Sequence, residues 1–234
     1  MHVLDNPVWH ALNGTHATLA ERNGTAARYL PEVAVFAALA DDVTPDAWSA
    51  LAALVGPSGV ANLARQELTP PETWSVMFTV PCRQMWLPDD AEPDDRDDAA
   101  RADRDTPLVE LGAPDVPEML ALVELTRPGP FATRTAELGT YLGVRVGGRL
   151  IAMAGERLHP AGFTEISAVC TDPGYRGRGL ASTLVRAVVR GIRARNERPF
   201  LHLTTENDPA FRVYSALGFE TRTHLSVLSV QAPG

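Results

Sequence analysis

Lysine is absent from this sequence of 234 residues, and all 21 of its basic residues are arginine. Without a Gly-Lys-Ser/Thr run, the lysine-dependent phosphate loop of the P-loop NTPases is excluded. Cysteine is almost as scarce, since Cys82 and Cys170 are the only two. Neither lies in a Cys-x-x-Cys or Cys/His spacing, so they build neither a disulfide framework nor a metal site. We therefore expect free thiols in a reducing compartment and no metal cofactor.

Long apolar runs and an excess of positive charge are also missing. The longest uncharged apolar stretches, Val33 to Ala40 and Ala47 to Val55, are far shorter than the roughly 18 residues that a membrane span requires. The opening residues, Met1 to Asp5, lack the basic and apolar regions of a signal peptide. A net charge of −8 argues against a nucleic-acid partner, whose affinity comes mainly from neutralised phosphates. We expect a cytoplasmic protein without membrane or nucleic-acid partners.

The chain is long enough to bury a sizeable core, and its composition changes most sharply at residues 88–106. That segment holds nine acidic residues against three arginines, and runs of this kind are usually solvated. We interpret residues 1–87 as an N-terminal α/β region, residues 88–106 as an acidic linker and residues 107–234 as a C-terminal domain. Attraction of cationic amines is the alternative role for the linker.

Hydrophobic periodicity predicts helices at Pro7–Arg22 and Ala47–Val55, the second entered through the capping residues Thr44-Pro45-Asp46. A β-rich alternation predicts a strand at Trp74–Val80. After the linker, the predicted order of elements is β-α-β-β-β-α-β-α-β. These elements are strand 108–111, helix 116–126, strands 141–146, 150–157 and 163–170, helix 180–195, strand 200–204, helix 209–217 and strand 225–230.

A glycine-rich turn lies between the predicted strand 163–170 and the predicted helix 180–195. Residues 174–181 of this turn read Gly-Tyr-Arg-Gly-Arg-Gly-Leu-Ala. The first N–H groups of a helix lack backbone partners, the helix dipole is positive there, and glycines let an anion approach closely. The turn is therefore predicted to bind a nucleotide-type diphosphate. Seven arginines in and after it add positive charge: Arg176, Arg178, Arg186, Arg190, Arg193, Arg195 and Arg198.

This turn resembles the acyl-CoA pyrophosphate loop of the GNAT superfamily of N-acetyltransferases. The family pattern Arg/Gln-x-x-Gly-x-Gly/Ala is matched by Arg176, Gly179 and Ala181. Glu165 lies eleven residues before Arg176, as in the histone-acetylating members. The family's second signature, Asn-x-x-Ala-x-x-x-Tyr-x-x-x-Gly-Phe, is matched downstream by Asn207, Ala210, Tyr214, Gly218 and Phe219. The resemblance spans roughly residues 108–230.

The resemblance implies an α+β, three-layer fold. We expect the GNAT fold in the C-terminal domain, with a mixed, mostly antiparallel sheet flanked by helices, and an α/β N-terminal half. The whole-chain layout resembles the glycine N-acyltransferase-like branch, and one interpretation of the N-terminal half is a degenerate copy of the same fold.

The resemblance also implies an acyl-CoA-dependent N-acyltransferase, which transfers acetyl from acetyl-CoA to an amine by direct attack in a ternary complex. The expected acceptor is a small amine, an amino acid or a peptide N-terminus, bound near residues 131–138 and the N-terminal half. A non-catalytic CoA-binding sensor and transfer to a hydroxyl are the alternatives, and monomer and homodimer both stay open. The expected CoA contacts are Ala168, Val169, Cys170, Arg176, Gly177, Arg178, Gly179, Leu180, Ala181 and Asn207.

Two residues are expected to carry the proton transfers. Strand alternation places Glu165 and Ser167 on one face, opposite Ile166, Ala168 and Cys170. Partial burial would raise the pKa of Glu165 and make it a general base, directly or through water. The alternative is a solvent-facing glutamate at the strand edge.

The family signature places Tyr214 as the proton donor to the departing CoA thiolate, because a phenol pKa near 10 lies close to that of a thiol. An ordinary core tyrosine is the alternative. Backbone N–H groups near Val169 and Cys170 are candidates for the oxyanion contact. We interpret the Cys170 side chain as a buried thiol, His159 as a surface-loop histidine and His202 as a satisfied sheet histidine. Asn207 either contacts CoA or caps the last helix.

Overall fold

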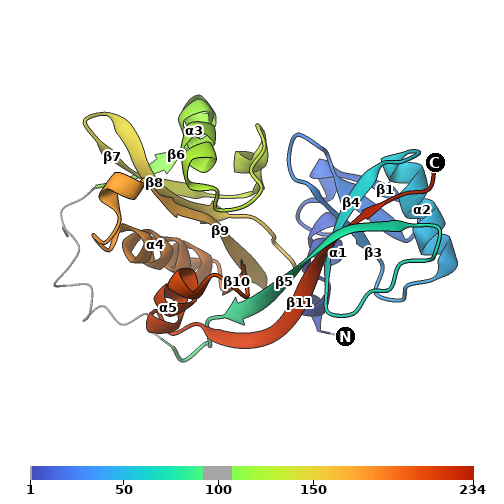
Figure 1. The fold of residues 1–234 in the computed structure, drawn as a ribbon. Helices are drawn as coiled ribbons and strands as arrows, with labels where there is room; N and C mark the ends of the chain where they lie inside the picture. The colour runs from blue at the N-terminus through green and yellow to red at the C-terminus, as the bar shows by residue number, and fades with distance from the viewer. Residues whose placement is uncertain (1, 92–106) are drawn as a thin grey trace.

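The computed structural model describes residues 2–91 and 107–234 and shows one sheet that runs through the whole molecule (Figure 1). Residues 2–87 are called the N-terminal half below, and residues 107–234 the C-terminal half. Most of the predicted acidic linker, residues 92–106, lies outside the described residues. No helix in the described part of the chain combines the length and apolar character needed to cross a bilayer.

The N-terminal half has more strands and less helix than its sequence predicted. The expected helix Pro7–Arg22 is wrong beyond Leu12, where the side-chain amide of Asn13 donates to the Trp9 carbonyl at 2.9 Å. Gly14 follows, and glycine is a poor helix former. The elements are η1 (Val3–Asp5), α1 (Pro7–Leu12), η2 (Ala17–Leu19), β1 (Ala20–Asn23), β2 (Ala26–Tyr29), β3 (Phe36–Leu39), α2 (Pro45–Val55), β4 (Val60–Arg65) and β5 (Ser75–Trp86).

The C-terminal half confirms the predicted order of strands and helices. Most boundaries agree within two residues, and the last strand begins five residues earlier than predicted. The elements are β6 (Leu108–Leu111), η4 (Ala113–Asp115), α3 (Val116–Thr126), η5 (Thr135–Leu138), β7 (Tyr141–Val146), β8 (Arg149–Glu156), β9 (Phe163–Thr171), η6 (Pro173–Tyr175), α4 (Leu180–Ala194), β10 (Arg198–Thr204), α5 (Asp208–Ala216) and β11 (Glu220–Gln231).

The sheet has eleven strands in the order β1-β2-β3-β4-β11-β5-β10-β9-β8-β7-β6. Helix α4 crosses from β9 to the parallel strand β10 and packs one apolar stripe on the sheet. This arrangement confirms the mixed, mostly antiparallel sheet that was expected. The buried residues of the stripe are Leu180, Leu184, Val185, Val188, Val189 and Ile192.

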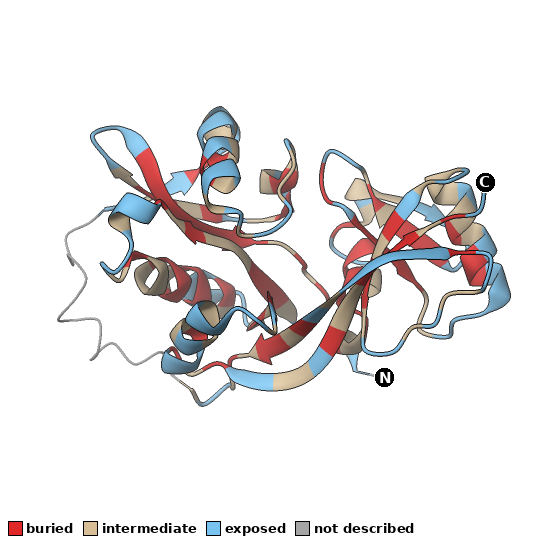
Figure 2. Ribbon diagram, in the orientation of Figure 1, coloured by how far each residue is buried: buried red, intermediate tan, exposed pale blue. Residues whose placement is uncertain are grey.

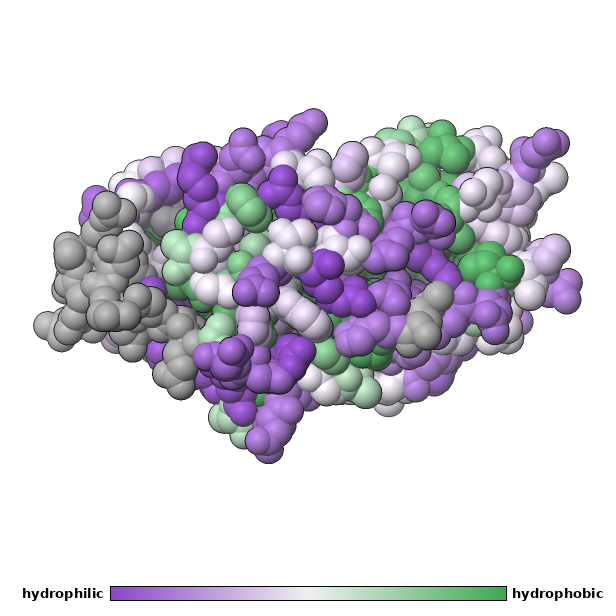
Figure 3. Space-filling view, turned by 90° about the horizontal axis from the view of Figure 1, so that it is seen from below, coloured by the Kyte–Doolittle hydropathy of each residue, from purple (hydrophilic) through white to green (hydrophobic). Residues whose placement is uncertain are grey.

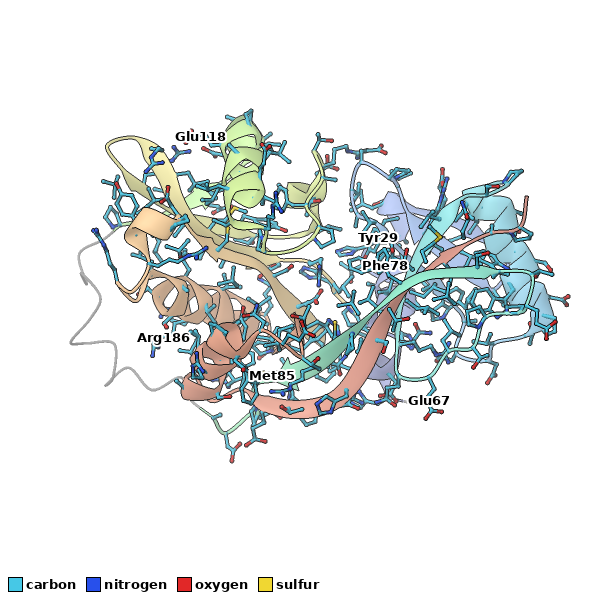
Figure 4. The ribbon with its side chains drawn as sticks, viewed as in Figure 1. Tyr29, Glu67, Phe78, Met85, Glu118 and Arg186 are labelled. Atoms are coloured by element: carbon cyan, nitrogen blue, oxygen red, sulfur yellow. The ribbon has the colours of Figure 1, made fainter. Side chains whose placement is uncertain are left out.

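Two long strands, β5 and β11, connect the halves. Strand β11 lies between β5 and β4. It pairs with β5 along its whole length and with β4 over its second half, while the end of β5 pairs with β10. Met85, near the end of β5, therefore lies in the core beneath α4 (Figure 4). Red, buried segments follow the sheet through both halves in Figure 2. The division at residues 88–106 stays a prediction.

Exposed large apolar side chains gather on the N-terminal half. Six of the eight in the described residues belong to it, and the view from below shows green patches toward that end (Figure 3). The six residues are Val35, Val43, Val60, Val76, Met77 and Phe78.

His16 is buried where the two halves meet. Its Nδ1 lies 2.7 Å from the Tyr29 hydroxyl, and its Nε2 lies 3.2 Å from the Leu138 carbonyl. Since only a protonated nitrogen can donate to the carbonyl, Nε2 carries the hydrogen and Nδ1 accepts from Tyr29. Burial, together with the neighbouring His159, lowers the pKa of His16 to about 4.

Acid should therefore begin to destabilise the fold at a pH above the range in which most carboxylates are protonated. The unfolded chain binds a proton at position 16 near pH 6.5, whereas the folded chain resists it down to about pH 4. We expect the free energy of unfolding to fall by about 3 kcal/mol between pH 7 and pH 4 from this group alone. Urea unfolding across that range should show the decrease, and His16→Gln should reduce it by most of that amount. An equal decrease in both proteins would contradict the assignment.

Candidate functional site

The glycine-rich turn continues directly from β9 into α4. Its first part, η6, is fixed by the Asp172 side chain, which accepts from the Gly174 N–H at 2.8 Å. Gly177 and Gly179 then take left-handed backbone conformations, with φ values of 76° and 74°. Residues with a Cβ rarely adopt these angles. The two glycines thus let the chain turn sharply into the helix.

The N-terminal end of α4, directly after this turn, has backbone N–H donors without a partner in the helix. The first N–H of α4 to reach a carbonyl one turn before it is that of Thr183, which donates to the Gly179 carbonyl at 3.0 Å. The preceding N–H groups, of Leu180, Ala181 and Ser182, have no helical carbonyl to pair with. A Cβ placed on Gly177 would meet no heavy atom within 4 Å, so the turn faces open space. Donors and room together fit a diphosphate.

Two arginines of the turn lie beside that space. Arg176 and Arg178 are exposed, and the Arg178 guanidinium stacks 4.9 Å from the centre of the Tyr175 ring. Arg149, from the start of β8, braces the same turn by donating to Asp172 at 3.0 Å and covering Tyr175. Sequence analysis did not identify Arg149, because it lies in a hairpin far upstream with no motif around it.

The other arginines do not all gather at the turn as their sequence positions suggested. Arg193, Arg195 and Arg198 lie at the opposite end of α4, about 20 Å away at 1.5 Å per residue. Arg193 donates to the carbonyls of Pro88 and Ala91. The other two pair with Glu156 and Asp89. These three cations therefore brace the far end of the helix.

A β-bulge interrupts β9 just before the turn. Ala168 and Val169 together oppose the single residue Ala154 of β8, and Ala168 has a φ of 53°. The extra residue reverses the alternation of side chains. Ile166 and Cys170, predicted on one face, consequently lie in different cores: Ile166 beneath α4 and Cys170 beneath α3. The prediction for this face is wrong for that reason.

The sheet opens beside the bulge. Strands β9 and β10 pair over three residues, and their last pair is Glu165 with Phe200. Both strands continue well past that pair, so they diverge beyond it. Helix α5 follows β10 and carries Tyr214. Val169 of the bulge and Tyr175 of the turn pack against the same buried cluster that contains Leu180 and Tyr214, so bulge, turn and phenol belong to one core.

Tyr214 is almost completely buried, with 9% of its surface exposed. Burial raises the pKa of its hydroxyl well above the ordinary value, and negative charge at Cys170 or Glu165 raises it further. The phenol is therefore protonated throughout the neutral range. Asn207, the other residue of the second signature, caps α5 by accepting from the Ala210 N–H at 3.2 Å.

Glu165 has no exposed surface and is held by two partners. Arg157 donates to both carboxylate oxygens, at 2.8 and 2.7 Å, and His202 Nδ1 lies 2.7 Å from one of them. Burial alone would raise the pKa of Glu165, but Arg157 and His202 lower it to about 2. The predicted upward shift is wrong, and the base assignment that rests on it loses its support.

The environments of Cys170, His202 and His159 were also predicted from the sequence. Cys170 is confirmed as a buried thiol, whose pKa burial raises to about 11. His202 is confirmed as a satisfied sheet histidine, because Glu165 and Gln84 occupy its two nitrogens. His159 is not at the surface: its side chain is 11% exposed and its ring centroid lies 5.1 Å from that of His16.

Comparison with known families supports the reading of the C-terminal half. The family model described as FR47-like protein matches residues 141–227. The N-alpha-acetyltransferase RimI of Mycobacterium tuberculosis is 35% identical over 100 residues, which cover 40% of this chain and 62% of that protein. The mycothiol acetyltransferase of Saccharomonospora viridis is 34% identical over 92 residues, 36% of this chain and 30% of that enzyme. The matches thus span less than two thirds of the length of each of these curated relatives.

Solved structures extend the similarity to the whole chain. A GNAT-family crystal structure from Novosphingobium aromaticivorans is 39% identical, covers 100% of both chains and superposes with a TM-score of 0.86. A GCN5-related N-acetyltransferase from Kribbella flavida is 17% identical over 97% of this chain and 96% of its own, with a TM-score of 0.57. The second similarity concerns the fold alone.

Proposed function

The chain belongs to the GNAT family, and from that premise we propose that it is an acyl-CoA-dependent N-acyltransferase that uses acetyl-CoA. The observation that carries the proposal is the turn Gly174–Gly179, which offers unpaired helix N–H groups, two exposed arginines and open space at one place. Those features suit the diphosphate of CoA. The adjacent divergence of β9 and β10 suits its thioester arm.

Acyl transfer requires one bond to form and one to break. The neutral acceptor nitrogen attacks the thioester carbonyl carbon and the C–N bond forms. The C–S bond breaks to release the thiolate, and the nitrogen gives up its extra proton to solvent water. Backbone N–H groups at the bulge, near Val169 and Cys170, are proposed to stabilise the developing oxyanion. Tyr214 is proposed to protonate the thiolate. Its raised pKa supports this role, because a donor must hold its proton at neutral pH.

The acceptor is proposed to be a small amine, an amino acid or a peptide N-terminus. The names of the curated relatives, an N-alpha-acetyltransferase and a mycothiol acetyltransferase, support this range of acceptors. Residues 131–138 and the N-terminal half are proposed to build the acceptor pocket. In support, the Thr135 hydroxyl donates to the Val33 carbonyl at 2.6 Å, and Arg134 pairs with Glu32. A cytoplasmic location belongs to the same proposal.

The N-terminal half is proposed to be a degenerate copy of the same fold, as in the glycine N-acyltransferase-like branch. Three antiparallel strands, β1 to β3, precede the helix α2 and the parallel strand β4, just as β7 to β9 precede α4 and β10. Strand β5 follows the first set of elements in the chain and strand β11 follows the second, and these two strands are neighbours in the sheet. The turn before α2 reads Ala-Asp-Asp-Val-Thr, and its two aspartates would repel a phosphate.

The proposal predicts release of free thiol from acetyl-CoA in the presence of amines. We expect thiol release with at least one member of a panel of amino-acid amides, short peptides and polyamines, and a matching acetylated product by mass spectrometry. Binding of acetyl-CoA without release for every acceptor would instead indicate a CoA-binding sensor. Release with alcohols alone would indicate transfer to a hydroxyl. The panel also tests the acidic linker, because its charge favours polyamines.

A further inference from the structure

Glu165 occupies the last paired position before β9 and β10 separate. Its backbone N–H donates to the Leu158 carbonyl at 2.8 Å, and its carbonyl accepts from the Arg157 N–H at 2.9 Å. Its carboxylate accepts from the Arg157 side chain and faces His202 on β10. Glu165 therefore ties the end of β8, strand β9 and strand β10 together at the apex of the opening.

The contacts continue from His202 to the N-terminal segment. Gln84 Nε2 donates to His202 Nε2 and to the Leu4 carbonyl, both at 2.9 Å. Since His202 Nε2 accepts a hydrogen bond, its Nδ1 carries the proton and donates to Glu165. Arg222 donates to Gln84 Oε1 at 2.8 Å and to Asp5 at 2.5 Å. Side chains from β9, β10, β5 and β11 thus form one network with η1, which is fully buried at Glu165 and Gln84 and partly exposed at Arg222 and Asp5.

Every polar atom of the carboxylate already has a partner. One oxygen accepts from Arg157 Nε, and the other accepts from both Arg157 Nη2 and His202. With no exposed surface, the group has no direct contact with bulk solvent. A general base must reach the proton that it removes, directly or through one water. The geometry gives Glu165 no such access.

We propose that Glu165 is a positioning residue, which holds the apex where β9 and β10 diverge and thereby places the bulge Ala168–Cys170 against the thioester. This inference rests on the proposed function of the opening between these strands. Glu165 acts through the backbone of β9 and through His202, and it accepts no proton during the reaction. The network extends this role to η1, so the N-terminal half contributes to the geometry of the C-terminal site.

The decisive test removes the carboxylate without leaving a buried charge unpaired. Glu165→Gln and Arg157→Met alone should each lower the melting temperature strongly, because each leaves part of the ion pair without its partner. The double variant, Arg157→Met with Glu165→Met, replaces the pair with apolar side chains of similar volume. We expect it to recover most of the melting temperature and to keep kcat within about tenfold of the wild type.

His202→Leu gives a second test that leaves the ion pair intact. Its kcat should fall about tenfold, while the dissociation constant for acetyl-CoA stays within about twofold, because the diphosphate turn is untouched. The carbonyl resonance of bound [1-¹³C]acetyl-CoA should move toward its position in free acetyl-CoA, a readout that needs no turnover. A merely structural residue would lower the melting temperature and leave this resonance unchanged.

The outcomes separate the two roles of Glu165. A folded double variant that binds acetyl-CoA but loses more than about 100-fold in kcat, together with the acid limb of its pH profile, would establish Glu165 as the base and overturn the proposal. If the double variant does not fold, an unchanged kcat and carbonyl resonance in His202→Leu would overturn it. A wild-type protein that binds acetyl-CoA but acetylates no acceptor would refute the proposed function instead, and the carbonyl resonance would still test the positioning.

Discussion

Replacing Gly177 with valine is expected to weaken the binding of acetyl-CoA by about 100-fold. The backbone of Gly177 has a φ of 76°, and the position of its missing side chain is open space. A valine side chain would project into the volume proposed for the diphosphate and would separate it from the helix N–H groups. Loss of two charge-assisted hydrogen bonds corresponds to about 3 kcal/mol, or about two powers of ten in affinity.

Gly56→Val is the matched control for this change. Gly56 follows α2 in the N-terminal half, has a φ of 79° and likewise faces open space. Both variants should lose about 1–3 kcal/mol of stability from the unfavourable backbone conformation. Calorimetric titration with acetyl-CoA should show weakened binding for Gly177→Val alone. Equal affinities in the two variants would mean that the diphosphate lies elsewhere.

Tyr214→Phe is expected to lower kcat by about 100-fold and to leave the affinity for acetyl-CoA unchanged. General acid catalysis contributes a factor of this order, and removal of the hydroxyl leaves the apolar ring to fill the same core. Because the pKa of Tyr214 is raised, the wild-type kcat should show no decrease from tyrosine ionisation up to about pH 10. Single-turnover rates at saturating acetyl-CoA measure the chemical step.

Tyr141→Phe controls for the loss of a buried hydroxyl. Tyr141 lies on β7 and is 1% exposed, and burial raises its pKa as well. Unlike Tyr214, which belongs to α5, it lies in the core beneath α3. We expect this variant to keep kcat within about threefold. Comparable losses in the two variants would indicate that Tyr214 acts through packing and not as a proton donor.

The sequence predicted the C-terminal half well because each of its elements carries a strong local signal. The apolar stripe of α4, the Gly147-Gly148 hairpin and Gly218 after α5 are all readable from neighbours in the chain. The first strands of the N-terminal half are short and rich in alanine, such as Phe36–Leu39, so they lack the alternation that marks a strand. These strands pair with one another and with β4, and β4 in turn pairs with β11, which lies more than 150 residues away in sequence.

The site shows the same contrast between local and distant information. The turn Gly174–Gly179 is contiguous, and its glycines and arginines predicted an anion site directly. The bulge at Ala168 was invisible, because one extra residue is indistinguishable from a regular strand in the sequence. The environment of Glu165 depends on Arg157, His202 and Gln84 from three other segments. Without those contacts, burial alone suggested a pKa shift of the wrong sign.

Calorimetric titration with acetyl-CoA and with acetyl-pantetheine tests most directly whether the turn before α4 binds a diphosphate. The two compounds share the thioester and its arm, but only acetyl-CoA carries the diphosphate and nucleoside. Micromolar binding of acetyl-CoA, with at least 100-fold weaker binding of acetyl-pantetheine, is the predicted result. Equal affinity for the two compounds, or no heat with either at millimolar concentration, would contradict it.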